Sequence, residues 1–147
     1  MQYNKKKHLK LLKSLQKSEN PRKILSDLES RPDENFFELE AYSAMVISHL
    51  HWENREQYFE LIEKLLNGPI NFLQLRKKHR AINDAGERLV LEPNPKSEGF
   101  DDLIDELVSL FDRYCPEPNL RESHEFSEEE LKKLIQKILI EMKDRYP

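Results

Sequence analysis

Apolar residues recur every three or four positions along the first half of the chain, the spacing that places them on one side of an α-helix. Leucines among lysines predict a first helix over residues 3–18, and an Asn-Pro pair opens a second over residues 20–31. The most apolar segment predicts a central third helix over residues 34–50, and a fourth follows over residues 53–67. Gly68 is typical of a left-handed residue that ends such a helix.

The second half of the chain predicts three more helices separated by loops. A fifth helix begins with Phe72. Two prolines two residues apart exclude a helix from residues 89–99, which we expect to form a loop. Helical spacing returns over residues 100–115. A capping box that starts at Ser127 predicts the beginning of the last helix, whose apolar stripe runs to Met142.

Length and composition add the fold class to this pattern. The chain has 147 residues, of which 35% are charged and only three are glycine, a balance that favours helices with polar surfaces over sheets. Its length fits one domain with its own hydrophobic core. We therefore expect an all-α protein, an antiparallel helical bundle of six to seven helices in a single domain over residues 1–147.

The sequence shows no sign of a secreted or membrane protein. Its lysine-rich start runs into a charged, leucine-rich segment rather than an uncharged apolar one. The lone Cys115 has no partner for an internal disulfide, and we expect it to be a small buried residue. The expected location is therefore the cytoplasm, without membrane association.

No motif of catalytic, cofactor or metal chemistry is visible. The three glycines lie too far apart to cradle a phosphate. His49 and His51 point in different directions on a helix, and no histidine or cysteine falls at zinc-ligand spacing. His79, on an apolar stripe, is expected to be a hydrogen-bonded histidine of the core or its rim. We therefore expect no catalytic residue, no metal and no cofactor, and a protein that is not an enzyme.

Charge is distributed unevenly along the chain, although the net charge is only −4. Residues 1–31 have a net charge of +6 and residues 131–147 one of +3, whereas residues 32–97 have −3 and residues 98–130 have −10. The acidic residues are thus concentrated on the sixth predicted helix and its flanking turns. Such asymmetry bears on which partners a protein attracts.

The apolar stripe of the sixth helix fixes which way its acids point. It leaves five carboxylates on the outer face: Asp101, Asp102, Asp105, Glu106 and Asp112. From charge alone, a solvated face and a binding surface are equally favoured. Crowding like charges onto one helix adds repulsion that dispersed charge would avoid, and this tips the interpretation towards a binding surface.

Two alternatives remain open beside a protein-binding surface. The basic residues of segments 5–17 and 76–80 have the charge to contact phosphates, which would make this a helical nucleic-acid-binding or RNA-associated protein. No aromatic residues interleave with them as a stacking platform for bases would require. The other alternative is an enzyme whose site leaves no recognisable motif.

Four segments in the last two-thirds of the chain have a distinctive order and spacing. They are YFELIEKLLNG (58–68), LEPNPKSEGFDDLIDEL (91–107), CPEPNLRE (115–122) and SEEELKKLIQKIL (127–139). Together they resemble the bacterial self-protective colicin-like immunity family over residues 52–147. Residues 1–50 lie outside the resemblance as extra N-terminal helices, and Pro69 departs from the family pattern at the start of a helix.

The resemblance implies a small antiparallel helical bundle that binds a nuclease toxin, in the type member one that cuts transfer RNA. An acidic surface then occupies the cationic active site of the toxin in place of RNA, and protects the cell that makes both proteins. The implied partner-binding residues are Asp101, Asp102, Asp105, Glu106, Asp112, Glu117 and Glu122. The expected partner is a cationic protein, and the resemblance implies nothing about the oligomeric state of this chain.

Overall fold

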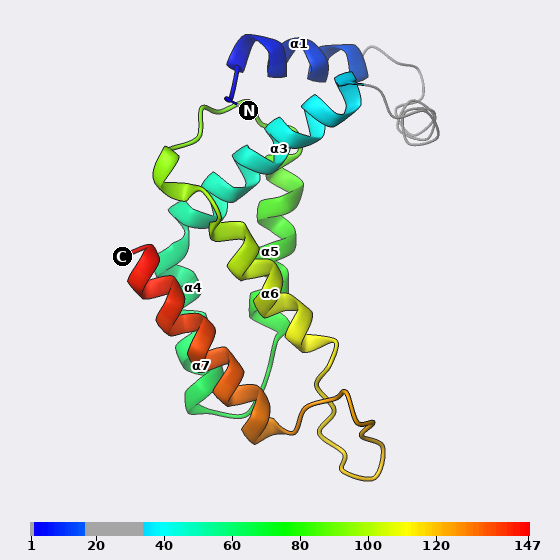
Figure 1. The fold of residues 1–147 in the computed structure, drawn as a ribbon, viewed down its shortest axis with the longest axis vertical. Helices are drawn as coiled ribbons and strands as arrows, with labels where there is room; N and C mark the ends of the chain where they lie inside the picture. Colours follow the sequence, from blue (N-terminus) through cyan, green and yellow to red (C-terminus); the bar gives the residue numbers. More distant parts are fainter. Residues whose placement is uncertain (1, 17–33) are drawn as a thin grey trace.

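The chain is all-α throughout the part that the computed structural model describes, residues 2–16 and 34–147 (Figure 1). The helices are α1 (Lys5–Gln16), α3 (Glu34–Glu53), α4 (Arg55–Asn67), α5 (Leu73–Gly86), the short 3-10 helix η1 (Pro95–Ser97), α6 (Phe100–Phe111) and α7 (Glu128–Arg145). This confirms the predicted fold class. The helix predicted over residues 20–31 lies outside the described residues.

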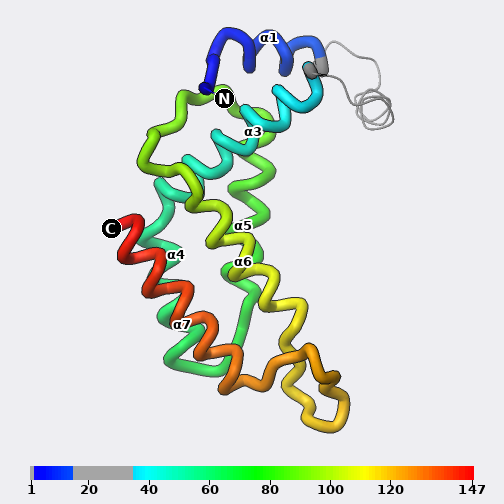
Figure 2. Tube along the Cα trace, viewed as in Figure 1, coloured from blue at the N-terminus to red at the C-terminus, as the bar shows by residue number. Residues whose placement is uncertain are grey.

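The long helices run in alternating directions and form an elongated bundle (Figures 1 and 2). The path descends through α3 and α4, rises through α5, descends through α6 and returns upwards in α7. Helix α3 packs against α1, α5 and α6, and α7 packs against α4 and α6. The α3 segment is therefore central, as its apolar composition predicts.

The core of the bundle comes from the predicted apolar stripes of α4, α5, α6 and α7. Its most deeply buried members include Tyr58, Phe100 and Leu107. Leu134 is only partly buried, whereas Leu110, which the predicted stripe omits, is buried. The stripe positions thus identify the core of the bundle, with errors at its margins.

Close packing of α3 against α5 depends on Gly86, the last residue of α5. A Cβ atom at this position would lie 2.4 Å from Cγ1 of Ile47 and 3.3 Å from its Cα. No side chain fits at that distance, so glycine allows the two helices to approach each other. This contact leaves no pattern in the sequence, because it depends on which helices are neighbours in the fold.

Several predicted details are wrong. Gly68 has φ −149° and is extended, so it is not a left-handed helix end. Helix α6 ends at Phe111 rather than at residue 115, because the backbone beyond it pairs with a distant segment: the Cys115 N–H donates to the Phe126 carbonyl at 3.2 Å. Cys115 is partly exposed rather than buried.

The start of α7 follows the prediction closely. The Ser127 side chain accepts a hydrogen bond from the Glu130 N–H at 3.2 Å, and its hydroxyl lies 3.0 Å from the Glu130 carboxylate. These contacts satisfy one of the backbone donors that a helix N-terminus leaves unpaired. Local sequence alone therefore determines where this helix begins.

Candidate functional site

The acidic helix α6 begins at a position where the backbone requires glycine. Gly99 has φ +83°, in the left-handed region, and a Cβ there would lie 2.9 Å from the Tyr146 hydroxyl. Asp101 and Asp102 follow in the first turn, where the partial positive charge of the helix N-terminus favours carboxylates. Gly99 thus accounts for the start of the helix at this position.

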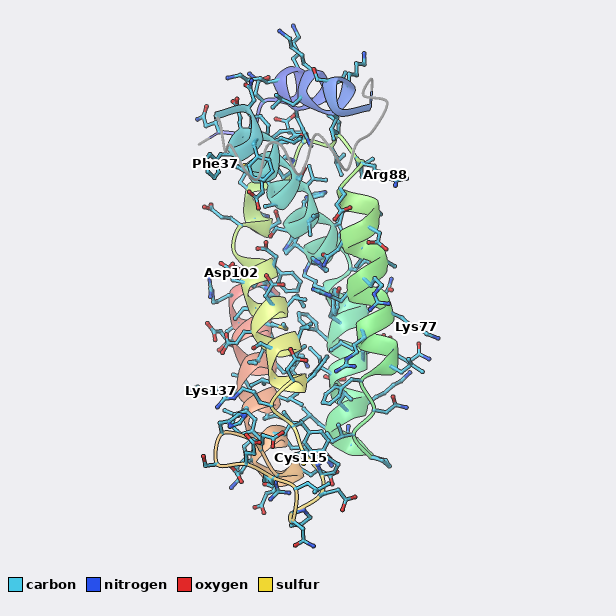
Figure 3. The ribbon with its side chains drawn as sticks, turned by 90° about the vertical axis from the view of Figure 1, so that its right-hand side faces the viewer. Phe37, Lys77, Arg88, Asp102, Cys115 and Lys137 are labelled. Atoms are coloured by element: carbon cyan, nitrogen blue, oxygen red, sulfur yellow. The ribbon has the colours of Figure 1, made fainter. Side chains whose placement is uncertain are left out.

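Four of the five predicted acids project into solvent. Asp102, Asp105, Glu106 and Asp112 are exposed. Figure 3 shows Asp102 on the opposite side of the view from Lys77 of α5. The helix itself contains no basic residue, and no described lysine or arginine nitrogen lies within 4.0 Å of its carboxylates. The outer surface of α6 is therefore a row of carboxylates without lysine or arginine partners among the described residues.

The acids of α7 are arranged differently, although α7 has five of them and α6 has four. Three of the five pair with bases one turn along the same helix: Glu128 with Lys132 at 3.4 Å, Glu129 with Lys133 at 3.6 Å, and Glu141 with Arg145 at 3.1 Å. Such pairs are the usual arrangement on a solvated helix surface. The α6 acids lack this pairing within their own helix.

Asp101 does not share the outward orientation that the sequence predicts. Its side chain is partly buried, and its backbone N–H lies 3.4 Å from Oγ of Ser48 on α3. Burial raises the pKa of the Asp101 carboxyl.

Asp105 borders a buried polar network. Its carboxylate lies 3.5 Å from Nε2 of His79, whose ring stacks on His51 with 5.3 Å between the ring centroids. His51 Nε2 donates to Oδ1 of Asn83 at 2.8 Å, so its Nδ1 accepts from the Tyr58 hydroxyl at 2.6 Å. His79 is thus a hydrogen-bonded histidine at the core rim, as predicted. Burial lowers the pKa of His51 to about 4, so this ring is neutral at pH 7.

Glu117 and Glu122 lie on an exposed loop at the end of the bundle opposite α1 (Figure 1). The ends of the loop are held together by the pairing of its backbone near Phe126 and by Arg113, whose guanidinium lies 4.4 Å from the centre of the Phe126 ring. The loop continues directly from the C-terminal end of α6. The seven predicted residues therefore follow one edge of the bundle rather than converging on a single point.

The basic residues of α5 do not form one surface. Arg76, Lys77 and Arg80 are exposed. Lys78 instead turns towards α4, where its ammonium donates to Asn54 at 3.0 Å and to the side chain of Gln57. With His79 turned towards α6, the predicted cluster is divided among three directions.

The sequence did not reveal the structural roles of three further histidines. His8, His49 and His51 are all buried. The Asn94 N–H donates to Nδ1 of His49 at 2.9 Å, while His51 contacts α4 and α5. The two α3 histidines therefore form hydrogen bonds with different neighbours, as their spacing predicts. A histidine within an apolar segment was the available signal of burial.

The described residues contain neither a cluster of metal ligands nor a membrane-spanning helix. Nowhere in residues 2–16 and 34–147 do three or more His, Cys, Asp or Glu side chains come together as metal ligands would. None of the described helices has the length and apolar character needed to cross a membrane.

The fold and this surface define an all-α bundle with an acidic edge, formed by Asp102, Asp105, Glu106 and Asp112, that has no lysine or arginine partner among the described residues. No family model, curated protein or solved structure matches the chain.

Proposed function

We propose that this protein is a non-enzymatic binding module whose acidic edge docks on a cationic surface of another protein. One observation carries the proposal: among the described residues no lysine or arginine nitrogen lies within 4.0 Å of an α6 carboxylate, while three acids of α7 each pair with a lysine or arginine on their own helix. Unpaired like charges repel one another, and a partner of opposite charge would relieve that repulsion.

The partner that best fits this edge is a nuclease with a cationic active site. Carboxylates spaced along a helix of 12 residues, about 18 Å long, present a row of negative charge such as a nucleic-acid backbone offers. The resemblance of residues 52–147 to colicin-like immunity proteins supports the same choice. In this proposal the protein binds a nuclease toxin and keeps RNA out of its active site.

A capture experiment followed by an activity assay tests the proposal. The native protein and the variant Asp102→Asn/Asp105→Asn/Asp112→Asn are used as baits in extract of the source cells at low salt, and any basic protein recovered is purified. The native protein should bind that protein and suppress its nuclease activity, whereas the variant should do neither. Recovery of the same partners by both baits, or recovery of no basic protein, would reduce the acidic edge to a solvated face.

A genomic observation adds an inexpensive check. A toxin gene immediately next to the gene for this chain would identify the nuclease to be assayed directly. If that nuclease is purified and the native protein leaves its activity unchanged, inhibition is excluded for that pair.

A further inference from the structure

A cleft of about 640 Å³ lies beside the start of α6, where four segments of the chain meet. Its walls come from residues 2–3, from Met45 and Ser48 of α3, from the loop between α5 and α6, and from Asp101. The volume falls within the range of sites that bind small molecules. Because these segments are far apart in sequence, the cleft exists only in the folded protein.

The cleft is negatively charged. Three carboxylates line it, those of Glu92, Glu98 and Asp101, and no described lysine, arginine or histidine does. Glu92 and Glu98 are exposed, whereas Asp101 is partly buried. The Ser48 hydroxyl next to Asp101 already donates to the Ser97 carbonyl at 2.9 Å. The Asp101 carboxyl is thus held in a partly desolvated position, with no described lysine or arginine nitrogen within 4.0 Å.

A purely structural role for Asp101 does not account for this position. A carboxylate in the first turn stabilises a helix through its dipole, and Asp102 supplies that interaction from solvent. Burial of Asp101 weakens the same benefit, since desolvation disfavours the charged form and raises its pKa. A cation bound in the cleft would reverse this effect.

The remaining walls indicate the shape of that cation. Met45, Pro93 and Pro95 provide apolar surface, which suits an aliphatic stem rather than a compact hydrated ion. We propose that the cleft receives a lysine or arginine side chain of the cationic partner, with its stem along these residues and its charged group at Asp101. This inference rests on the proposed function and identifies the point at which the partner is anchored.

An NMR titration with small probes tests the cleft directly. N-acetyl-arginine amide is added to the isotope-labelled protein, with N-acetyl-citrulline amide as the uncharged analogue of equal shape. The arginine probe should cause saturable shifts at amides around Ser48, Asn94 and Asp101, and the citrulline probe should bind at least about tenfold more weakly. This ratio is the loss expected for one charge-assisted hydrogen bond. Equal binding of the two probes, or shifts spread evenly along α6, would overturn the proposal.

Two variants with the same change of charge provide the matched control. Asp101→Asn should weaken the arginine probe about tenfold, whereas Asp102→Asn, one residue away and outside the cleft, should change its affinity less than about twofold. Equal effects of the two would mean that only diffuse attraction operates. Spermidine is the third probe, and markedly tighter binding of spermidine than of the arginine probe would assign the cleft to free polyamines instead of a protein side chain.

The two proposals fail separately. Asp102, Asp105 and Asp112 do not line the cleft. If the arginine probe does not bind while the triple variant still loses its partner, the acidic edge stands without the cleft. If the probe binds and the triple variant keeps its partner, the cleft stands and the acidic edge is not the docking surface.

Discussion

At the scale of single residues, burial has different consequences for two titratable side chains, one histidine and one aspartate. His51 is fully paired by Tyr58 and Asn83 and remains neutral in the core. Asp101 is partly buried with less compensation, and its charged form is disfavoured. A buried titratable group with a shifted pKa and a full set of hydrogen-bond partners is a structural feature. One that lacks such partners marks a candidate binding site.

We predict that His51 makes the fold sensitive to mild acid. The pKa of His51 is about 4 in the folded protein, against about 6.5 when the side chain is solvated. Below pH 6.5 the unfolded chain therefore binds a proton that the folded chain does not bind. The free energy of unfolding should therefore fall between pH 6.5 and 4, by about 3 kcal/mol from this group. Urea unfolding at several pH values measures this decrease in the free energy of unfolding.

The comparison with variants isolates the contribution of His51. His51→Gln should destabilise the protein at pH 7, and this difference should shrink as the pH is lowered towards 4. His124→Gln is the matched control, because His124 is exposed and should not change the pH dependence. A constant difference between the native protein and His51→Gln across this range would contradict the prediction.

Asp101 should have the opposite effect on stability. Its pKa is raised in the folded protein, so this carboxyl stabilises the fold only while it is protonated, and that contribution is lost as the pH rises through its folded pKa. Asp101→Asn should therefore unfold at a higher urea concentration than the native protein at pH 7, with a smaller advantage near pH 4. The exposed Asp102→Asn should show no such gain. A larger loss of stability for Asp101→Asn than for Asp102→Asn would show that Asp101 is structural.

At the scale of helices, the sequence shows where most of the helices lie. It says little about which helices contact one another. Each described α-helix appears as a stripe or a cap, and Ser127 fixes one boundary to the residue. The short 3-10 helix η1 is an exception, because it lies within residues 89–99, where the two prolines were expected to exclude any helix. The end of α6 was misplaced because the Phe126 backbone, distant in sequence, takes up the hydrogen bonds that would extend the helix. Periodicity reports which side of a helix is buried, but a boundary set by tertiary pairing leaves no local pattern.

We predict that Gly86 cannot be replaced although it lies within a helix. Alanine is favoured over glycine in a helix by up to about 1 kcal/mol. At this position, however, the new Cβ would meet a β-branched side chain of α3, Ile47, at 2.4 Å. Overpacking of this kind costs about 1–3 kcal/mol, so Gly86→Ala should lower the free energy of unfolding.

Gly68→Ala is the control for this substitution. The nearest atom to a Cβ at Gly68 is the Lys64 carbonyl oxygen at 3.6 Å, an ordinary contact, and its extended backbone suits any residue. This variant should be neutral or more stable by up to about 1 kcal/mol, because alanine reduces the freedom of the unfolded chain. Urea unfolding of both variants checks the pair, and a stabilised Gly86→Ala would show that α3 and α5 are not in close contact.

At the scale of the whole molecule, the arrangement of charge was visible in the sequence but its pairing was not. Counting residues located the −10 segment, and the stripe of α6 gave the outward direction of Asp102, Asp105 and Glu106. Neither pattern could show that three acids of α7 pair with bases of their own helix while the α6 acids have no lysine or arginine partner among the described residues, or that Asp101 lines a cleft with α3. These features depend on distances between segments that only the folded chain brings together.

The unpaired acidic edge leads to a kinetic prediction for the cationic partner of the proposed function. Electrostatic attraction between exposed surfaces mainly accelerates association and is screened by salt, with a Debye length of about 10 Å at 0.1 M. Asp102→Asn/Asp105→Asn/Asp112→Asn should therefore associate markedly more slowly at low salt, and its association rate should depend much less on ionic strength. The control is Glu40→Gln/Glu56→Gln/Glu60→Gln, which removes the same charge from exposed acids of α3 and α4. Stopped-flow mixing at several salt concentrations measures both. If the two triple variants slow association equally, net charge rather than the α6 edge guides the partner.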